Sequence, residues 1–464
     1  MGIGIQTEDG KVTAAGSVAL NDIQNTIDAH ISGGQVNAGG TIRLNASDEK
    51  GDKKTRIHAI SGAIAGSLGD DESFTSAGSG AAAINSIQNT ITTSVETADL
   101  DAEGDISASA TSSAEIEAIT FGVSGTLASG EGGGISLAGA GSGSGNTVAN
   151  VIESSIQGGD VDADGVVSLS ATDDMTITAD AGGAGLAISS GQGNSTAIAF
   201  GASAASNDVD NQVRTVLDGA TVTGTDGVAL TATSTANIDT LTLAGAGSAS
   251  SSQSGSFASS GAGAGSGNQV NNTVESIVQN GSTVDTNETL ALSATDDSKI
   301  NADAGGAAIA LAGGQGGGVG VSVGAAAATN EIGNTIRASV NSSTVNASGN
   351  LDVSATSSAD IDVLALGISG ALAGGQGGGV SFAGAGSGSG NTVANVVESS
   401  IKDSPVTVAG QAKLTAIDDT KITADAGATA LALAGGQGGG VSVAIGASVS
   451  TNDVDNQVRT IVDK

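Results

Sequence analysis

Apolar and small residues alternate with polar residues along most of the chain, with a local period of two. In segment 345–355, for example, Val, Ala, Leu, Val and Ala lie on alternate positions around a Gly-Asn turn. A period of two places these side chains on one face of a strand. Glycine-rich stretches such as 313–318, 374–379 and 435–440 separate the alternating segments and suit turns. Because no amphipathic helix interrupts this pattern, we expect an all-β chain.

The alternating segments belong to a repeat of 61 or 62 residues, apart from one first interval of 64. Its marker is a motif with Asn at positions one and five and apolar residues at positions three and seven. A glycine-rich turn keeps the same phase and carries Glu131, Gln192, Gln253, Gln315, Gln376 and Gln437. Repeats of this kind stack into solenoids, because each unit buries its apolar side against its neighbours. The motif begins at Asn21, Asn85, Asn146, Asn207, Asn268, Asn330, Asn391 and Asn452.

The repeat predicts one continuous β-solenoid over residues 1–464, a parallel β-helix of eight units that alternate in two types. Five Phe are the only aromatic residues, and 75 Gly are present. Gly, Ala and Ser lie among the aliphatic residues, so opposing sheets can approach closely. We therefore expect a wide, flattened tube with a thin interior.

The alternation of unit types indicates how many coils each unit makes in the stack. At the eighth motif position one type carries Arg and the other an acidic residue, with Thr92 as the exception. If one unit makes one coil, these opposite charges stack about 4.8 Å apart and the Asn side chains form amide ladders. Three coils of about 20 residues per unit would separate the charges by about 14 Å, so we favour one wide coil. The predicted ladder residues are Asn25, Asn89, Asn150, Asn211, Asn272, Asn334, Asn395 and Asn456, with Glu153, Arg214, Glu275, Arg337, Glu398 and Arg459.

The net charge of −34, with only 14 Lys and Arg, disfavours nucleic acid and anionic membranes as partners. No apolar stretch is long enough to insert into a membrane. The chain has no Cys, which fits a large exported bacterial protein. Both ends look like cuts in a longer protein, so an export signal is expected outside this sequence.

Recurrent acidic pairs are the main candidates for chemistry. Carboxylates on a stacked edge would supply oxygen ligands for Ca²⁺, which would be the one cofactor; the alternative is a solvated acidic turn. β-roll calcium sites are not expected, because Gly occupies the place where those repeats need Asp. The calcium candidates are Asp173, Asp174, Asp296, Asp297, Asp418 and Asp419.

Asp173, Asp174 and Arg214 also invite comparison with β-helical polysaccharide lyases, which use Asp-bound Ca²⁺ and an Arg base. The same set recurs twice more along the chain. A catalytic site has no reason to occur three times in series, whereas a structural ladder must, so we expect no enzyme activity. Segment 48–56 is the one irregular, mixed-charge stretch; we interpret it as a surface loop, with partner binding as the alternative.

The strand-turn-strand signature Val-x-Ala-x-Gly-x-Leu-x-Val-x-Ala at 345–355, with related segments at 161–171, 222–232 and 284–294, resembles a known repeat region. It is similar to that of giant filamentous-haemagglutinin-like bacterial exoproteins, above all the leukotoxin-family filamentous adhesins. The resemblance implies an extracellular or cell-surface location and an adhesive or stalk role, although that family builds narrower coils. An unknown receptor would bind through domains outside this chain. The alternatives are a fibre subunit that pairs with itself end to end and a calcium-stiffened extender.

Overall fold

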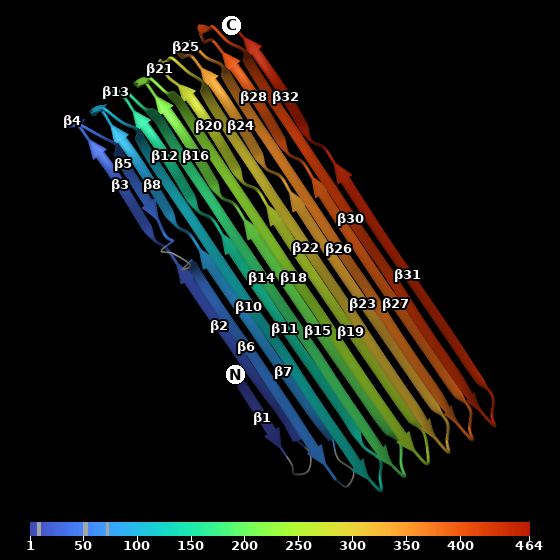
Figure 1. Cartoon of the computed structure of the whole chain (residues 1–464). Coiled ribbons are helices and arrows are strands. Elements are labelled where there is room, and N and C mark those ends of the chain that lie inside the picture. Colours follow the sequence, from blue (N-terminus) through green and yellow to red (C-terminus); the bar gives the residue numbers. More distant parts are fainter. Residues whose placement is uncertain (7–10, 50–53, 71–73) are drawn as a thin grey trace.

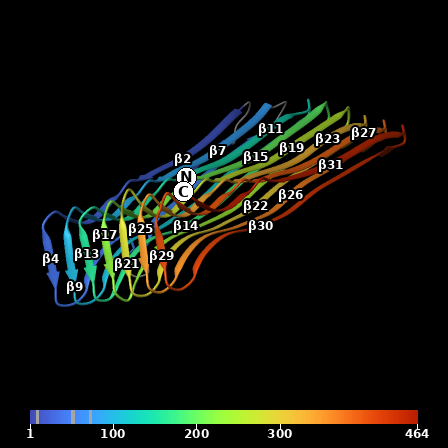
Figure 2. The same ribbon diagram turned by 90° about the horizontal axis from the view of Figure 1, so that it is seen from above.

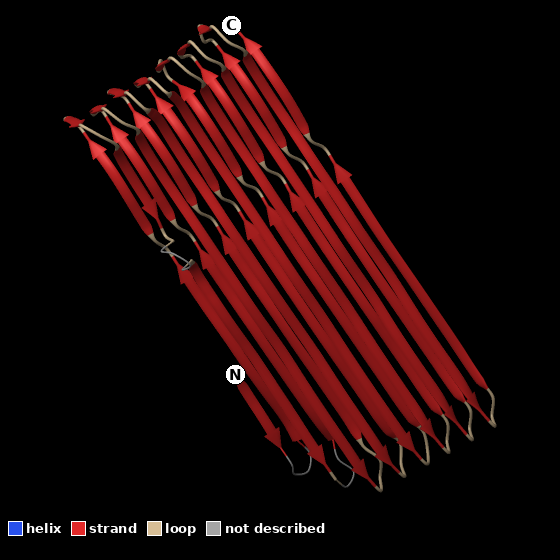
Figure 3. Cartoon of the chain, in the orientation of Figure 1, coloured by secondary structure: helices blue, strands red, loops and turns tan. Residues whose placement is uncertain are grey.

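The computed structural model describes residues 1–6, 11–49, 54–70 and 74–464, and these residues form strands and turns (Figures 1 and 3). Each complete unit is one coil of four strands. In one such coil, β14 (Val166–Gly191) runs across the full width, and β15 (Ser195–Val209) and β16 (Gln212–Asp218) run back. The short β17 (Thr221–Gly224) then closes one end of the coil. Figure 2 shows these short strands in a row that runs along the stack, at one end of the coils.

Equivalent strands of successive coils form four parallel sheets, which we name A to D. Sheet A contains β1 (Gly2–Gln6), β6 (Thr55–Gly69), β10 (Ile106–Gly130), β14, β18 (Gly227–Ser252), β22 (Leu290–Gly314), β26 (Leu351–Gly375) and β30 (Ala412–Gly436), with β5 (Ile42–Ser47) also paired to β10. Sheet B contains β2 (Lys11–Ile23), β7 (Phe74–Ile87), β11 (Ile135–Val148), β15, β19 (Ser256–Val270), β23 (Gly318–Ile332), β27 (Gly379–Val393) and β31 (Gly440–Val454).

Sheets C and D continue each coil after sheet B. Sheet C contains β3 (Thr26–Ser32), β8 (Thr90–Glu96), β12 (Val151–Gln157), β16, β20 (Thr273–Gln279), β24 (Thr335–Asn341), β28 (Val396–Lys402) and β32 (Gln457–Asp463). Sheet D contains β4 (Gln35–Ala38), β9 (Asp99–Ala102), β13 (Asp160–Ala163), β17, β21 (Thr283–Thr286), β25 (Thr344–Ala347) and β29 (Val406–Val408).

The register between coils confirms the prediction of one wide coil per unit. Asn146 pairs with Asn207, and Asn207 pairs with Asn268, so each residue lies beside its equivalent in the next unit. The alternative of three narrow coils per unit is wrong. The fold is the predicted all-β parallel solenoid, and any one-residue slip would turn every inward side chain outward.

The interior narrows from one end of each coil to the other. Where sheet A faces sheets C and D, a part that we call the thick half, Val213, Leu217 and Leu230 are fully buried. Next to the glycine-rich turns the interior holds small residues, Ala such as Ala187 and Ala197 together with buried Ser such as Ser189. We call this thin part the blade; in five successive coils it comprises residues 181–206, 242–267, 304–329, 365–390 and 426–451.

In the blade the large apolar side chains lie outside and the small ones inside, which is the reverse of an ordinary core. Leu186 is 50% exposed and Phe200 is 52% exposed, whereas the adjacent Ala187 and Ala199 are 0% exposed. Sheets A and B approach so closely that a Cβ on Gly367 would lie 2.1 Å from the carbonyl oxygen of Gly386. Only glycine and other small residues fit between the sheets, so the large aliphatic side chains point outward.

Replacement of Gly367 by Ala tests this close approach. We expect Gly367→Ala to destabilise the fold by about 1 to 3 kcal/mol, because backbone atoms rather than flexible side chains obstruct the new methyl group. Gly386→Ala, in the same coil, is the matched control: its Cβ would meet nothing within 4 Å. Thermal unfolding followed by circular dichroism measures both. Equal melting temperatures for the two variants would contradict the packing described here.

Candidate functional site

The first Asn of each motif forms an amide ladder along the solenoid. Each side-chain Nδ2 donates to the Oδ1 of the next coil's Asn, and the seven donor–acceptor distances from Asn21 to Asn452 are 2.7 or 2.8 Å. An amide carries both a donor and an acceptor, so identical residues satisfy each other when stacked. From Asn85 to Asn391 these side chains are buried.

The fifth Asn of each motif links the coils in a second way, at the bend between sheets B and C. Its backbone N–H donates to the Oδ1 of the equivalent Asn in the next coil, as from Asn211 to Asn272 at 3.1 Å and from Asn272 to Asn334 at 2.7 Å. The Nδ2 group is thereby left to donate across the interior toward sheet A. The structure brings together all eight of these predicted ladder residues.

The acceptors on sheet A include the first member of each acidic pair. Asp173 is 0% exposed and accepts from Asn211 at 2.6 Å and from Asn150 at 3.5 Å. Asp296 is also 0% exposed and accepts from Asn334 at 2.6 Å and from Asn272 at 3.3 Å. Asp418 receives the corresponding bonds from Asn395 and Asn456.

Serine occupies the same column of sheet A in the coils between. The register runs Ser112, Asp173, Ser234, Asp296, Ser357 and Asp418. The enclosed carboxylates therefore never lie on adjacent rungs, where like charges would repel. Enclosure still disfavours their charged form, although the amide and hydroxyl donors oppose this effect. Burial raises the pKa of Asp173 to about 7 and that of Asp296 to about 6.

Sequence reasoning missed a fourth member of this network, Asp48. Its carboxylate accepts from the backbone N–H of Ser113 at 2.8 Å, from Asn89 Nδ2 at 3.0 Å and from Thr55 Oγ1 at 3.0 Å. We interpreted Asp48 as the start of a charged surface loop because the charges that follow it hide the repeat phase. Residues 50–53 of that segment lie outside the described residues.

The acidic pairs do not converge as calcium ligands would have to. Adjacent strand residues point to opposite faces, so Asp174, Asp297 and Asp419 face outward while their partners face inward. The Asp174 side chain is 51% exposed and pairs with Lys54 at 2.8 Å. Among the described residues, no group of three or more His, Asp or Glu is placed to hold a metal ion.

The acid–base series lies on the outer side of sheet C. Arg214 lies between Glu153 at 3.4 Å and Glu275 at 3.1 Å, and Glu275 also pairs with Arg337 at 3.4 Å. Farther along, Glu398 pairs with Arg459 at 3.8 Å. The structure thus brings the six predicted charges into one row. Partly exposed pairs of this kind each contribute about 0.2 to 1 kcal/mol.

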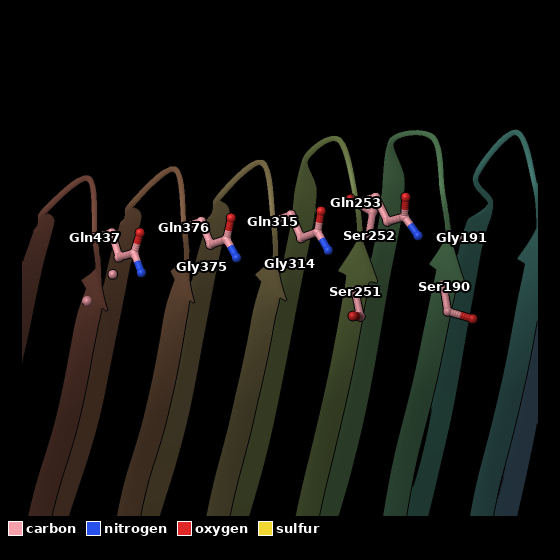
Figure 4. A pocket seen from close by; sticks show the side chains of 12 residues that line it. Ser190, Gly191, Ser251, Ser252, Gln253, Gly314, Gln315, Gly375, Gln376 and Gln437 are labelled. Atoms are coloured by element: carbon pink, nitrogen blue, oxygen red, sulfur yellow. The ribbon is translucent and has the colours of Figure 1, made fainter.

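A row of glutamines follows the tips of the blade. Gln253, Gln315, Gln376 and Gln437 come from the same turn of four successive coils, and their side chains point the same way (Figure 4). They border a shallow hollow of about 790 Å³ that Ser190 and several glycines also line. The lining residues are amides, hydroxyls and glycine backbone, so the hollow offers hydrogen bonds but no titratable side chain.

The buried carboxylates give stability a predictable pH dependence. Their pKa is higher in the folded than in the unfolded chain, so their contribution is complete below about pH 4 and is lost as the pH rises through about 6 to 7. For Asp296 the loss is up to roughly 3 kcal/mol. We expect Asp296→Ser, which copies Ser234 and Ser357, to narrow the gap between melting temperatures at pH 5 and pH 8.

Asp297→Ser is the control, because it removes the same charge from the outward face of the same coil. It relieves general repulsion within a chain of net charge −34. Of the causes that raise the pKa of Asp296 it removes only the repulsion from Asp297, and it leaves burial, the largest cause, unchanged. If both variants narrowed the gap equally, surface repulsion rather than the buried carboxylate would cause the pH dependence.

Comparisons with known proteins identify no relative of this chain. No protein-family model, no curated protein and no solved structure matches the chain. The described part of the chain also contains no helix long and apolar enough to span a membrane. The resemblance to filamentous-haemagglutinin-like repeats therefore stays a prediction from the sequence.

Proposed function

We propose that this chain is a structural spacer, a stalk or extender in a bacterial cell-surface protein of the filamentous-haemagglutinin-like adhesin type, and that it performs no catalysis. One observation carries the proposal: the recurrent polar groups satisfy one another between neighbouring coils. Asn207 binds Asn268, Arg214 binds Glu275, and Asp173 accepts from two ladder asparagines. Hydrogen bonds and ion pairs between each coil and the next resist separation of the coils and therefore stiffen the stack.

The lyase-like set supports a structural rather than catalytic interpretation. Asp173 is enclosed, Asp174 faces outward from sheet A, and Arg214 faces outward from sheet C on the opposite side of the coil. A general base and a metal ligand must reach the same substrate atoms. Side chains on opposite surfaces of a packed solenoid do not meet this requirement.

Composition supports an extracellular location for such a spacer. The chain combines an acidic surface, no Cys and a repeat that resembles the adhesin type. In this proposal the receptor contacts belong to domains outside the chain, and the solenoid sets their distance from the cell. A calcium-stiffened form of the spacer would melt at a lower temperature after addition of a chelator.

Removal of coils tests the spacer directly. Deletion of residues 208–330 removes two coils and joins Asn207 to the residue that follows Asn330. Arg337 then pairs with Glu153, which keeps the alternation of acid and base on sheet C. Ser357 lies beside Asp173, which keeps the alternation of Asp and Ser inside sheet A. We expect a folded rod shortened by about 10 Å, which electron microscopy and small-angle scattering can measure.

Deletion of residues 208–268 is the matched control, because it removes one coil and breaks the alternation. It places Glu275 beside Glu153 and the enclosed Asp296 beside Asp173, so we expect a melting temperature well below that of the two-coil deletion. Eight coils predict a stack about 35 to 40 Å long that does not change on dilution. Filaments that lengthen with concentration would instead support the fibre alternative.

A further inference from the structure

The charge of this chain is divided unevenly across each coil. The blade segments of five successive coils, 181–206, 242–267, 304–329, 365–390 and 426–451, contain no Asp, Glu, Lys, Arg or His. The net charge of −34 therefore belongs mainly to the thick half. On sheet A the outward carboxylates Asp180 and Asp303, which lie on either side of Leu241, border the uncharged surface.

The outer side of sheet A within the blade, which we call the apolar face, carries large aliphatic side chains. Leu186 is 50% exposed, Leu243 51%, Ile309 53% and Leu431 54%. Two shallow grooves cross this face. One of about 880 Å³ is lined by Leu311, Leu372 and other apolar residues, and one of about 550 Å³ is lined by Leu243, Leu366 and glycines.

The face alternates large and small residues in both directions. Along one column Gly182, Leu243, Gly305 and Leu366 follow one another, and four residues away Leu186, Gly247, Ile309 and Gly370 alternate in the opposite phase. In each coil, a large residue in one column thus lies beside a glycine in the other column. Such a surface is self-complementary when a second copy is turned about a two-fold axis that lies in the plane of the contact and runs along the stacking direction, because Leu186 then lies opposite Gly182 and Leu243 opposite Gly247.

We propose that the apolar face binds the same face of a second copy of this chain. The apolar face continues from the five uncharged coils onto β10 and β6, where Val123, Leu127, Ile60 and Leu68 are also exposed. It thus spans seven strands of sheet A, β6 to β30, and about eight residues of strand length, which gives roughly 900 Å² per copy. Stable protein interfaces bury about 800 Å² per partner. A contiguous apolar surface of this size is larger than soluble monomers ordinarily expose.

Charge favours a second copy over an anionic partner or lipid. The apolar face offers no cation to bind phosphate or carboxylate. A two-fold contact through the blades directs the two acidic halves away from each other, so the repulsion between copies is smallest in this arrangement. The contact is lateral and goes beyond the proposed spacer function, because it thickens the rod without lengthening it.

The experiment compares charged substitutions on the two sides of the same blade. Leu186→Asp with Ile309→Asp places charges on the apolar face, at positions 50% and 53% exposed. Phe200→Asp with Val323→Asp does the same on sheet B of the same two coils, at 52% and 50% exposure. Analytical ultracentrifugation of the full chain over a concentration series gives the dissociation constant of each protein.

We expect the unaltered chain and the sheet B variant to form dimers at micromolar concentration. The variant on the apolar face should dissociate at least 100-fold more readily. Added salt should tighten the dimer, because it screens repulsion between the acidic halves. A monomeric unaltered chain at 100 times these concentrations would overturn the proposal, as would disruption by the sheet B variant alone. Flotation of the chain with phosphatidylcholine vesicles, lost in the apolar-face variant, would overturn it in favour of a lipid occupant.

A second measurement covers the case in which the charged variants do not fold. The chain has no cysteine, so a single Leu311→Cys on the apolar face or Val323→Cys on sheet B reports its own surroundings. Alkylation of Leu311→Cys should slow at least tenfold as the protein concentration rises through the dimer range, while Val323→Cys should react at a constant rate. Equal rates for the two thiols at all concentrations would overturn the proposal. Rod length from electron microscopy tests the spacer function separately, since a lateral dimer keeps that length.

Discussion

In-register stacking of one coil on the next is the constraint on which the rest of this structure depends. Parallel strands about 4.8 Å apart place each side chain against its own equivalent in the neighbouring unit. A residue type is therefore acceptable at a position only if it tolerates a neighbour of the same or the alternate type. The register from Asn146 through Asn207 to Asn268 shows this condition in its simplest form.

The period of two coils follows from the same constraint. Asn can stack on Asn because its amide both donates and accepts, so the Asn ladders repeat in every coil. A carboxylate cannot stack on a carboxylate without repulsion, so Asp173 is followed by Ser234 and Glu153 by Arg214. Side-chain size also alternates from coil to coil on the outer face of the blade. Leu243 leans over Gly305, where an added Cβ would lie 2.9 Å from Leu243 Cδ2.

The sequence was sufficient to predict the features that stacking controls. The spacing of the Asn motifs and the alternation of Arg with Glu indicated one coil per unit, the Asn ladders and the row of charges. It did not show which member of an acidic pair lies inside, because a strict period of two is unchanged when the faces are exchanged. Nor did it show the inverted blade, since an aliphatic side chain such as Leu186 ordinarily predicts burial. The role of Asp48 in the inner network was not predicted, because an irregular, charged segment interrupts the repeat beside it.

The shape of the coil explains why the two halves differ in composition. At one end, four-residue strands such as β17 hold sheets A and C apart, and Leu217 and Leu230 fill the space. At the other end, a short turn joins sheets A and B directly, so only small side chains fit between them. The blade therefore buries little aliphatic surface inside and carries its large side chains outside, where they cover the glycines of adjacent rungs. The same geometry that closes the coil thus leaves an uncharged, apolar surface on a strongly acidic protein.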